Sequence, residues 1–206
     1  MLGSGWTRRL RMLLAVAACA GLPARAEEIQ DWPCEVPLAE RFVAEEVWGG
    51  PLPGPLPTDW RDYGAAAEAV AFAASPENRP ATGAAAIADL AARLGGERQE
   101  VLLALFAGLL DQFNTLRGYV IGGVRDFVVR AKILQEAIDA NEAALAALPQ
   151  AGGPAVEQLR DGYREARAFD ARNQDDALEE AEFLCRRYAY LEEKLRHLAD
   201  AIRSAL

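Results

Sequence analysis

The sequence is poor in the residues on which most catalytic and metal sites depend. It has one histidine, His197, and lacks a Cys-x-x-Cys-His haem motif, a Gly-x-Ser-x-Gly nucleophile turn and a Gly-x-Gly-x-x-Gly phosphate loop. A zinc site with two histidines therefore cannot form. Ser75 and Ser204 fall at predicted helix ends, where neither is set up as a nucleophile. These absences predict a protein that is not an enzyme and that carries no metal or cofactor.

Long apolar runs are also missing, and the run at residues 12–22 is too short to span a bilayer. Arg8, Arg9 and Arg11 precede this run, and Ala24-Arg25-Ala26 follows it with small residues on both sides of the arginine. This order is typical of a secretory signal peptide that is cleaved after residue 26. Lipoprotein processing at Cys19 is the alternative. Arginine and alanine are common and lysine is scarce, which favours a bacterial, periplasmic protein.

Positive charge is in short supply. Residues 27–206 hold 18 basic and 31 acidic residues, a formal charge of −13. Such a chain is poorly suited to nucleic acid or anionic lipid, so we expect a protein partner in the cell envelope and no nucleic acid. The acidic residues cluster at 175–182, but calcium needs six to eight oxygens, usually from a loop that wraps it. A solvated helix face is the simpler interpretation of this cluster.

Cleavage after residue 26 leaves two cysteines, Cys34 and Cys185. In an oxidising compartment two cysteines most simply form one disulfide, which here would tie the N-terminal arm to the last helix. Trp32 stands beside Cys34, and we expect its indole to pack near Gly118, Gly122 and Gly123. Large facing side chains, Leu184 and Phe183, favour close approach at these glycines.

Two long segments, residues 97–148 and 154–204, repeat apolar residues at steps of three and four, the pattern of an antiparallel coiled-coil hairpin. The turn is marked by Pro149, Gly152 and Gly153, and Pro154 suits the first turn of the second helix. The steps place Leu116 opposite Tyr188 and Asn141 opposite Tyr163. The inward residues on the first helix are Leu102, Phe106, Leu109, Phe113, Leu116, Val120, Val124, Phe127, Ala131, Leu134, Ile138, Asn141, Leu145 and Leu148. Those on the second are Val156, Leu159, Tyr163, Ala166, Asp170, Asn173, Ala177, Ala181, Leu184, Tyr188, Leu191, Leu195, Leu198 and Ile202.

Apolar residues spread beyond this seam near residues 102–121, which predicts that further helices cover the base of the hairpin while the tip stands free. Three short helices are expected there, at residues 37–48, at 59–74 with Thr58 as cap, and at 82–94 with Thr82 as cap. Residues 51–57 alternate proline and form an extended connector. No strand or repeat is evident. The predicted fold is all-α, with a signal peptide (1–26), an N-terminal arm (27–57) and a helical domain (58–206).

The segments Asp31-Trp32-Pro33-Cys34 and Val47-Trp48-Gly49-Gly50-Pro51 give the chain a resemblance to short secreted bacterial proteins of uncharacterised function. The resemblance covers about 25 residues and implies no activity and no site residue.

Two functions fit the pattern best; a hydrolase or transferase that relies on carboxylates alone is the third and weakest alternative, because no carboxylate pair is singled out by its spacing. The first is a non-enzymatic interaction or scaffold protein whose hairpin arm meets a protein partner, with Asn141, Gln150 and Arg160 near the turn and Trp32 on the N-terminal arm as candidate interaction residues. The second is a small-ligand or metal-binding module that uses the tryptophan-rich base, formed by Trp32, Trp48 and Trp60.

Overall fold

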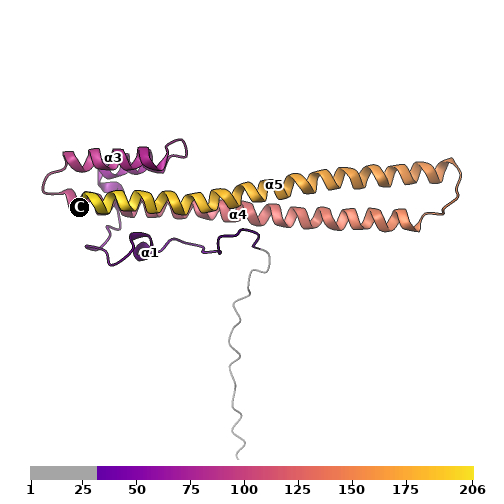
Figure 1. The fold of residues 1–206 in the computed structure, drawn as a ribbon, viewed down its shortest axis with the longest axis horizontal. Helices are drawn as coiled ribbons and strands as arrows, with labels where there is room; N and C mark the ends of the chain where they lie inside the picture. Colours follow the sequence, from indigo (N-terminus) through magenta and orange to yellow (C-terminus); the bar gives the residue numbers. More distant parts are fainter. Residues whose placement is uncertain (1–31) are drawn as a thin grey trace, which may run out of the picture. The chain divides into compact units, whose positions relative to one another are not determined.

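The computed structural model describes residues 32–206, so the predicted signal peptide and Cys19 lie outside the described residues. Residues 32–206 form a unit without strands. The helices are α1 (Ala44–Trp48), the 3₁₀ turn η1 (Trp60–Asp62), α2 (Gly64–Ala74), α3 (Pro80–Arg93), α4 (Arg98–Ala147) and α5 (Pro154–Ala205). Figure 1 shows α4 and α5 side by side along their length, which confirms the predicted all-α hairpin.

The seam between α4 and α5 follows the predicted spacing almost throughout. All fourteen inward residues of α4 are buried or half-buried, as are those of α5 with the exception of Leu159, which is 53% exposed. Steps of three and four keep these side chains on one stripe of each helix, so each helix buries its stripe against the other.

The pairing shifts near the turn. Arg160, rather than Leu159, turns inward and donates a 2.8 Å hydrogen bond from Nη2 to the carbonyl oxygen of Pro149. Asn141 donates to Asp170 at 3.2 Å, so the predicted pairing of Asn141 with Tyr163 is wrong. Residues 148–153 connect the two helices without helical geometry. The predicted pairs were counted outward from the turn along both helices, and that count did not allow for the length of this connection.

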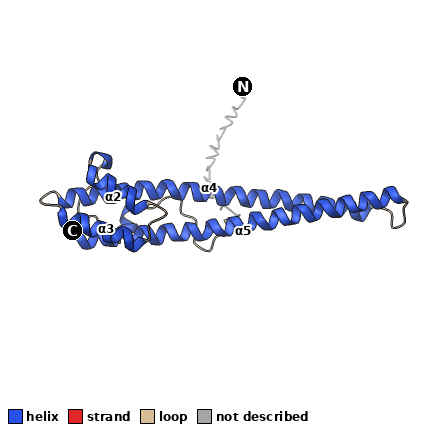
Figure 2. Cartoon of the chain, turned by 90° about the horizontal axis from the view of Figure 1, so that it is seen from above, coloured by secondary structure: helices blue, strands red, loops and turns tan. Residues whose placement is uncertain are grey.

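The base of the hairpin is covered, as the width of its apolar stripe predicted. Helix α2 packs on α4, and α3 packs on α5 (Figures 1 and 2). Trp48 of α1 meets Phe106 edge-on with ring centroids 4.9 Å apart. This core includes residues of α4 up to Val128 and residues of α5 from Leu184 onward, but none of residues 129–183. We call residues 129–183 the hairpin arm.

The expected helix at residues 37–48 is reduced to Ala44–Trp48. Upstream of it, the backbone N–H of Ala39 donates to Tyr188 Oη at 2.8 Å, and that of Phe42 donates to Asn114 Oδ1 at 2.7 Å. Because α4 and α5 take these donors, residues 37–43 do not form the internal hydrogen bonds of a helix.

The other two short helices also start differently from the expectation. In place of one helix at residues 59–74, η1 and α2 are separated at Tyr63, and the N-cap residue of η1 is Asp59 rather than Thr58. Trp60 is buried in η1 and donates from Nε1 to Asp111 at 3.3 Å. Helix α3 begins at Pro80, so Thr82 lies inside its first turn. Proline is favoured at the first position of a helix because the N–H that it lacks would have no hydrogen-bond partner within the helix.

The glycines of α4 differ in what surrounds them. A Cβ at Gly123 would lie 2.8 Å from Leu184 Cδ1, which confirms close approach there. A Cβ at Gly118 or Gly122 would meet nothing within 4 Å, so the same expectation is wrong for these two. Both face away from α5, where no side chain of residues 32–206 presses on them.

An open glycine, Gly118, and a crowded one, Gly108, give a matched pair of substitutions on α4. Gly118→Ala is expected to raise the free energy of unfolding by up to about 1 kcal/mol, because alanine is the better helix former. Gly108→Ala is expected to lower it by about 1–3 kcal/mol, because its Cβ would lie 2.6 Å from Val70 Cγ2 and 2.8 Å from the Trp60 indole. Urea unfolding of both variants checks this; destabilisation by Gly118→Ala would show that its surroundings are closed.

Candidate functional site

The interaction residues predicted near the turn lie on the hairpin arm, but most are occupied locally. Gln150 is exposed in the turn. Arg160 is held by the carbonyl of Pro149 and lies 3.6 Å from Glu157, although its buried Nε has no hydrogen-bond partner in the described chain. Asn141 is half-buried and bonded to Asp170. Of these three residues, Gln150 alone is presented freely to a partner.

Trp32 is remote from the turn. Its ring meets Tyr188 edge-on at 5.2 Å, and its Nε1 donates a 2.9 Å hydrogen bond to the carbonyl of Val36. Tyr188 lies about 50 Å along α5 from the turn, at 1.5 Å per residue. A Cβ at Gly118, Gly122 or Gly123 would meet no Trp32 atom within 4 Å, so Trp32 packs on Tyr188 and makes no direct contact with these glycines.

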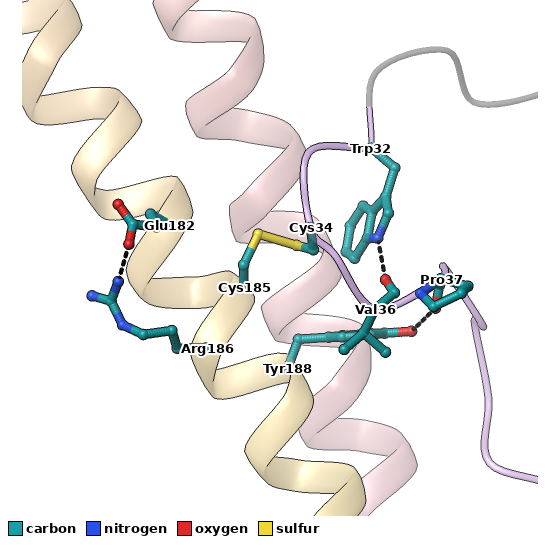
Figure 3. The surroundings of a disulfide bond; sticks show 8 residues. All are labelled: Trp32, Cys34, Val36, Pro37, Glu182, Cys185, Arg186 and Tyr188. Carbon is teal, nitrogen blue, oxygen red and sulfur yellow. Dashed lines mark hydrogen bonds and ion pairs between the residues drawn. A yellow bond between two sulfur atoms is a disulfide. The ribbon is translucent and has the colours of Figure 1, made fainter.

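Residues 32–43, which we call the N-terminal segment, are fixed to the hairpin by several contacts, of which two come from α5. The first is a disulfide between Cys34 and Cys185 of α5 (Figure 3). The second is the hydroxyl of Tyr188, which accepts from the N–H of Ala39 and lies 3.1 Å from the carbonyls of Pro37 and Ala39, to one of which it donates. An extended segment without helical hydrogen bonds is thereby held in place.

Arg117 of α4 lies at the centre of this attachment, with 1% of its surface exposed. Its Nε donates to the carbonyl of Ala39 at 2.6 Å, and its Nη2 donates to Tyr188 Oη. The guanidinium lies 4.0 Å from the Phe42 ring and 4.2 Å from the Tyr188 ring, and 3.8 Å from Glu192. A buried cation is tolerated because two rings, two acceptors and one carboxylate surround it. Its role is structural, since all of its contacts are internal.

Lys194 is the second buried cation, and its contacts are also internal. Its Nζ donates to the carbonyls of Ser75 at 2.7 Å and Asn78 at 2.8 Å, just beyond the C-terminal end of α2. Burial, with a smaller contribution from Arg187, lowers the pKa of Lys194 from its ordinary value. Sequence reasoning missed both cations, yet each is marked by its spacing: Arg117 is four residues after Phe113, and Lys194 is three after Leu191, on the apolar stripes.

Lys194→Met is expected to lower the free energy of unfolding by about 2 kcal/mol, because the two carbonyls lose their donors. Because the pKa of Lys194 is lower in the folded than in the unfolded state, the wild-type protein should gain stability as pH rises through the folded pKa towards about 10.4. The methionine variant lacks this gain, so the gap between the two should widen over that interval. Urea unfolding at several pH values measures it, and a gap that narrows would contradict the lowered pKa.

Two grooves adjoin the N-terminal segment. One, of about 450 Å³, is lined by Pro33, Cys34, Glu35, Val36, Val128, Leu178, Ala181, Glu182, Cys185, Arg186 and Ala189. We call it the disulfide groove. The other, of about 480 Å³, is polar and is lined by Glu40, Arg41, Asp111, Asn114, Thr115, Gly118, Ile121, Gly122 and Arg125. Neither groove includes a tryptophan, since Trp48 and Trp60 are buried in the core.

Within residues 32–206 no three histidine, cysteine or acidic side chains are placed to hold a metal ion, and the acidic residues at 175–182 do not converge. His197 is exposed on α5. No helix in the same residues is apolar and long enough to cross a membrane. Comparison with protein-family models, with curated proteins and with solved structures found no match.

Proposed function

We propose that this protein is a non-enzymatic, exported helical protein whose hairpin arm binds a protein partner in the cell envelope. The observation that carries the proposal is the exposure of apolar side chains on the arm. Of the ten large hydrophobic residues exposed in residues 32–206, six lie between 129 and 183: Val129, Ile133, Leu159, Phe169, Leu178 and Phe183. Two helices that keep such side chains in water, outside the core covered by α1, α2 and α3, offer a surface for another protein.

Two further features agree with this proposal. The Cys34–Cys185 disulfide fits the oxidising compartment that export would reach. The tryptophans considered for a ligand pocket serve packing instead, because Trp48 and Trp60 are buried and Trp32 lies against Tyr188. The small-ligand alternative therefore loses its tryptophan-lined base.

Site-specific photo-crosslinking in cells tests the proposal. A photoreactive residue at Gln150 or Phe169 on the arm should capture one defined envelope protein, whereas the same residue at Ala85, exposed on α3 at the base, should not. Deleting residues 141–160 should abolish capture by the probe at Phe169 and leave the melting of the base intact. Equal capture from Ala85, or none from the arm of a folded and oxidised protein, would contradict the proposal.

A further inference from the structure

The disulfide groove has an apolar floor on which Leu178 stays exposed to solvent. Val128 of α4 and Leu178 and Ala181 of α5 line it, and Leu178 is 51% exposed. Pro33 and Val36 form the opposite wall. An exposed leucine in a concave apolar surface is better matched by an apolar side chain of another molecule than by water.

One unpaired carboxylate lines the groove and another lies next to it. Glu35 stands on the N-terminal wall and makes no ion pair with any residue of the described chain. Glu182 and Arg186 on α5 neutralise one another in an ion pair (Figure 3). Asp175 lies three residues before Leu178, one turn further along the same line of α5, and is exposed. A partner that places apolar side chains on Leu178 therefore meets uncompensated carboxylates at Glu35 and Asp175.

The line of α5 that borders the groove is long enough for a helix to lie along it. Asp175, Leu178, Glu182, Cys185 and Ala189 follow one another at steps of three and four, which spans about 20 Å at 1.5 Å per residue. An amphipathic helix laid along such a line docks through apolar side chains spaced at three, four and seven residues.

We propose that the disulfide groove binds a basic amphipathic helix of a partner protein, with its apolar face on Leu178 and the neighbouring Val128 and its lysines or arginines at Glu35 and Asp175. The inference rests on the proposed function and gives the partner its chemistry. It also makes binding depend on the disulfide, because Cys34 and its neighbours form one wall. Within the described chain, the Cys34–Cys185 disulfide is the one cross-link between residues 32–36 and α5. Reduction of this bond therefore lets residues 33–36, which line the groove, move away from α5.

Fluorescence anisotropy of the oxidised full-length protein tests the inference. The probe is a labelled helical peptide of about 14 residues with leucines on one face and lysines on the other. We expect it to bind, to lose affinity as salt screens the carboxylates, and to bind about tenfold or more weakly to Leu178→Arg. Phe183→Arg is the matched control, because Phe183 is also 51% exposed on α5 but does not line the groove, and it should change the affinity by less than about twofold.

Reduction, or replacement of both cysteines by serine, should weaken the probe by a similar factor while the helix content stays unchanged. Equal binding to Leu178→Arg and Phe183→Arg, binding of a leucine–glutamate peptide as tight as that of the lysine peptide, or binding unaffected by reduction would each overturn the inference. Crosslinking from the arm that survives in Leu178→Arg would refute the groove and leave the proposed function standing, whereas absence of capture from the arm of the folded, oxidised wild-type protein would refute both.

Discussion

Replacing Arg117 with methionine will lower the free energy of unfolding by about 3 kcal/mol and loosen the N-terminal segment from the hairpin. Methionine fills much of the volume but donates no hydrogen bond. The carbonyl of Ala39 and the hydroxyl of Tyr188 then each lose a charged donor, and Phe42 and Tyr188 lose the cation between their rings. Urea unfolding measures the first effect, and the rate of tryptic cleavage after Arg41, which lies in the segment, measures the second.

Arg125→Met is the matched control for this experiment. Arg125 is on the same helix and also reaches the N-terminal segment, through an ion pair with Glu40 at 3.6 Å. Its side chain is 44% exposed and that of Glu40 is 75% exposed, so solvent weakens the pair and its loss should cost less than about 1 kcal/mol. Similar losses at the two arginines would show that burial and the ring contacts of Arg117 contribute little.

Removing the disulfide will have an effect of similar or larger size. Cys34 and Cys185 are 151 residues apart, and closing a loop of that length stabilises the folded state by about 5 kcal/mol in the chain-entropy model. Serine at both positions should therefore shift the urea midpoint strongly downward while the far-ultraviolet circular dichroism, which reports α4 and α5, stays the same. An unchanged midpoint would mean that the N-terminal segment is equally restricted in the unfolded chain without the bond.

The two changes act on the same segment, so their effects should not add. Once the cysteines are replaced, Arg117 and Tyr188 still hold residues 37–42, and the cost of losing Arg117 then measures that attachment alone. A double-mutant cycle with Arg117→Met and the two serines should give a coupling free energy above about 0.5 kcal/mol. Additive effects would indicate that the bond and the buried arginine stabilise separate units.

The hairpin was predictable because its signal is local and repeated. Each step of three or four between Leu102 and Leu148 adds the same evidence, and the wider apolar stripe at residues 102–121 predicted the covering helices. The segment at residues 37–43 was not predictable in the same way. Its apolar spacing resembles that of a helix, but Tyr188 and Asn114, far away in the sequence, take its backbone donors. A periodicity in one segment carries no information about such distant partners.

The candidate site, too, was predictable only where its signal is local in the sequence. The exposure of Gln150 followed from its place in a turn marked by proline and glycine. The disulfide groove did not follow, because its floor comes from α4 and α5 and its wall from residues 33–36. Leu178 is not among the inward residues of α5, and nothing in the sequence indicates that another segment runs beside it. Such a site becomes visible when three distant segments are placed together.

The unequal cover along α4 has a consequence for local opening. Residues 101–106 are all buried, whereas beyond Val124 the buried residues of α4 are seven residues apart, or about two turns, at Ala131 and Ile138. Amide hydrogens in the first half should exchange with deuterium mainly through global unfolding, and those towards Ala147 through fraying that starts at the turn. One continuous helix would then show a gradient of protection, in which the end near the turn opens many times before the base opens once.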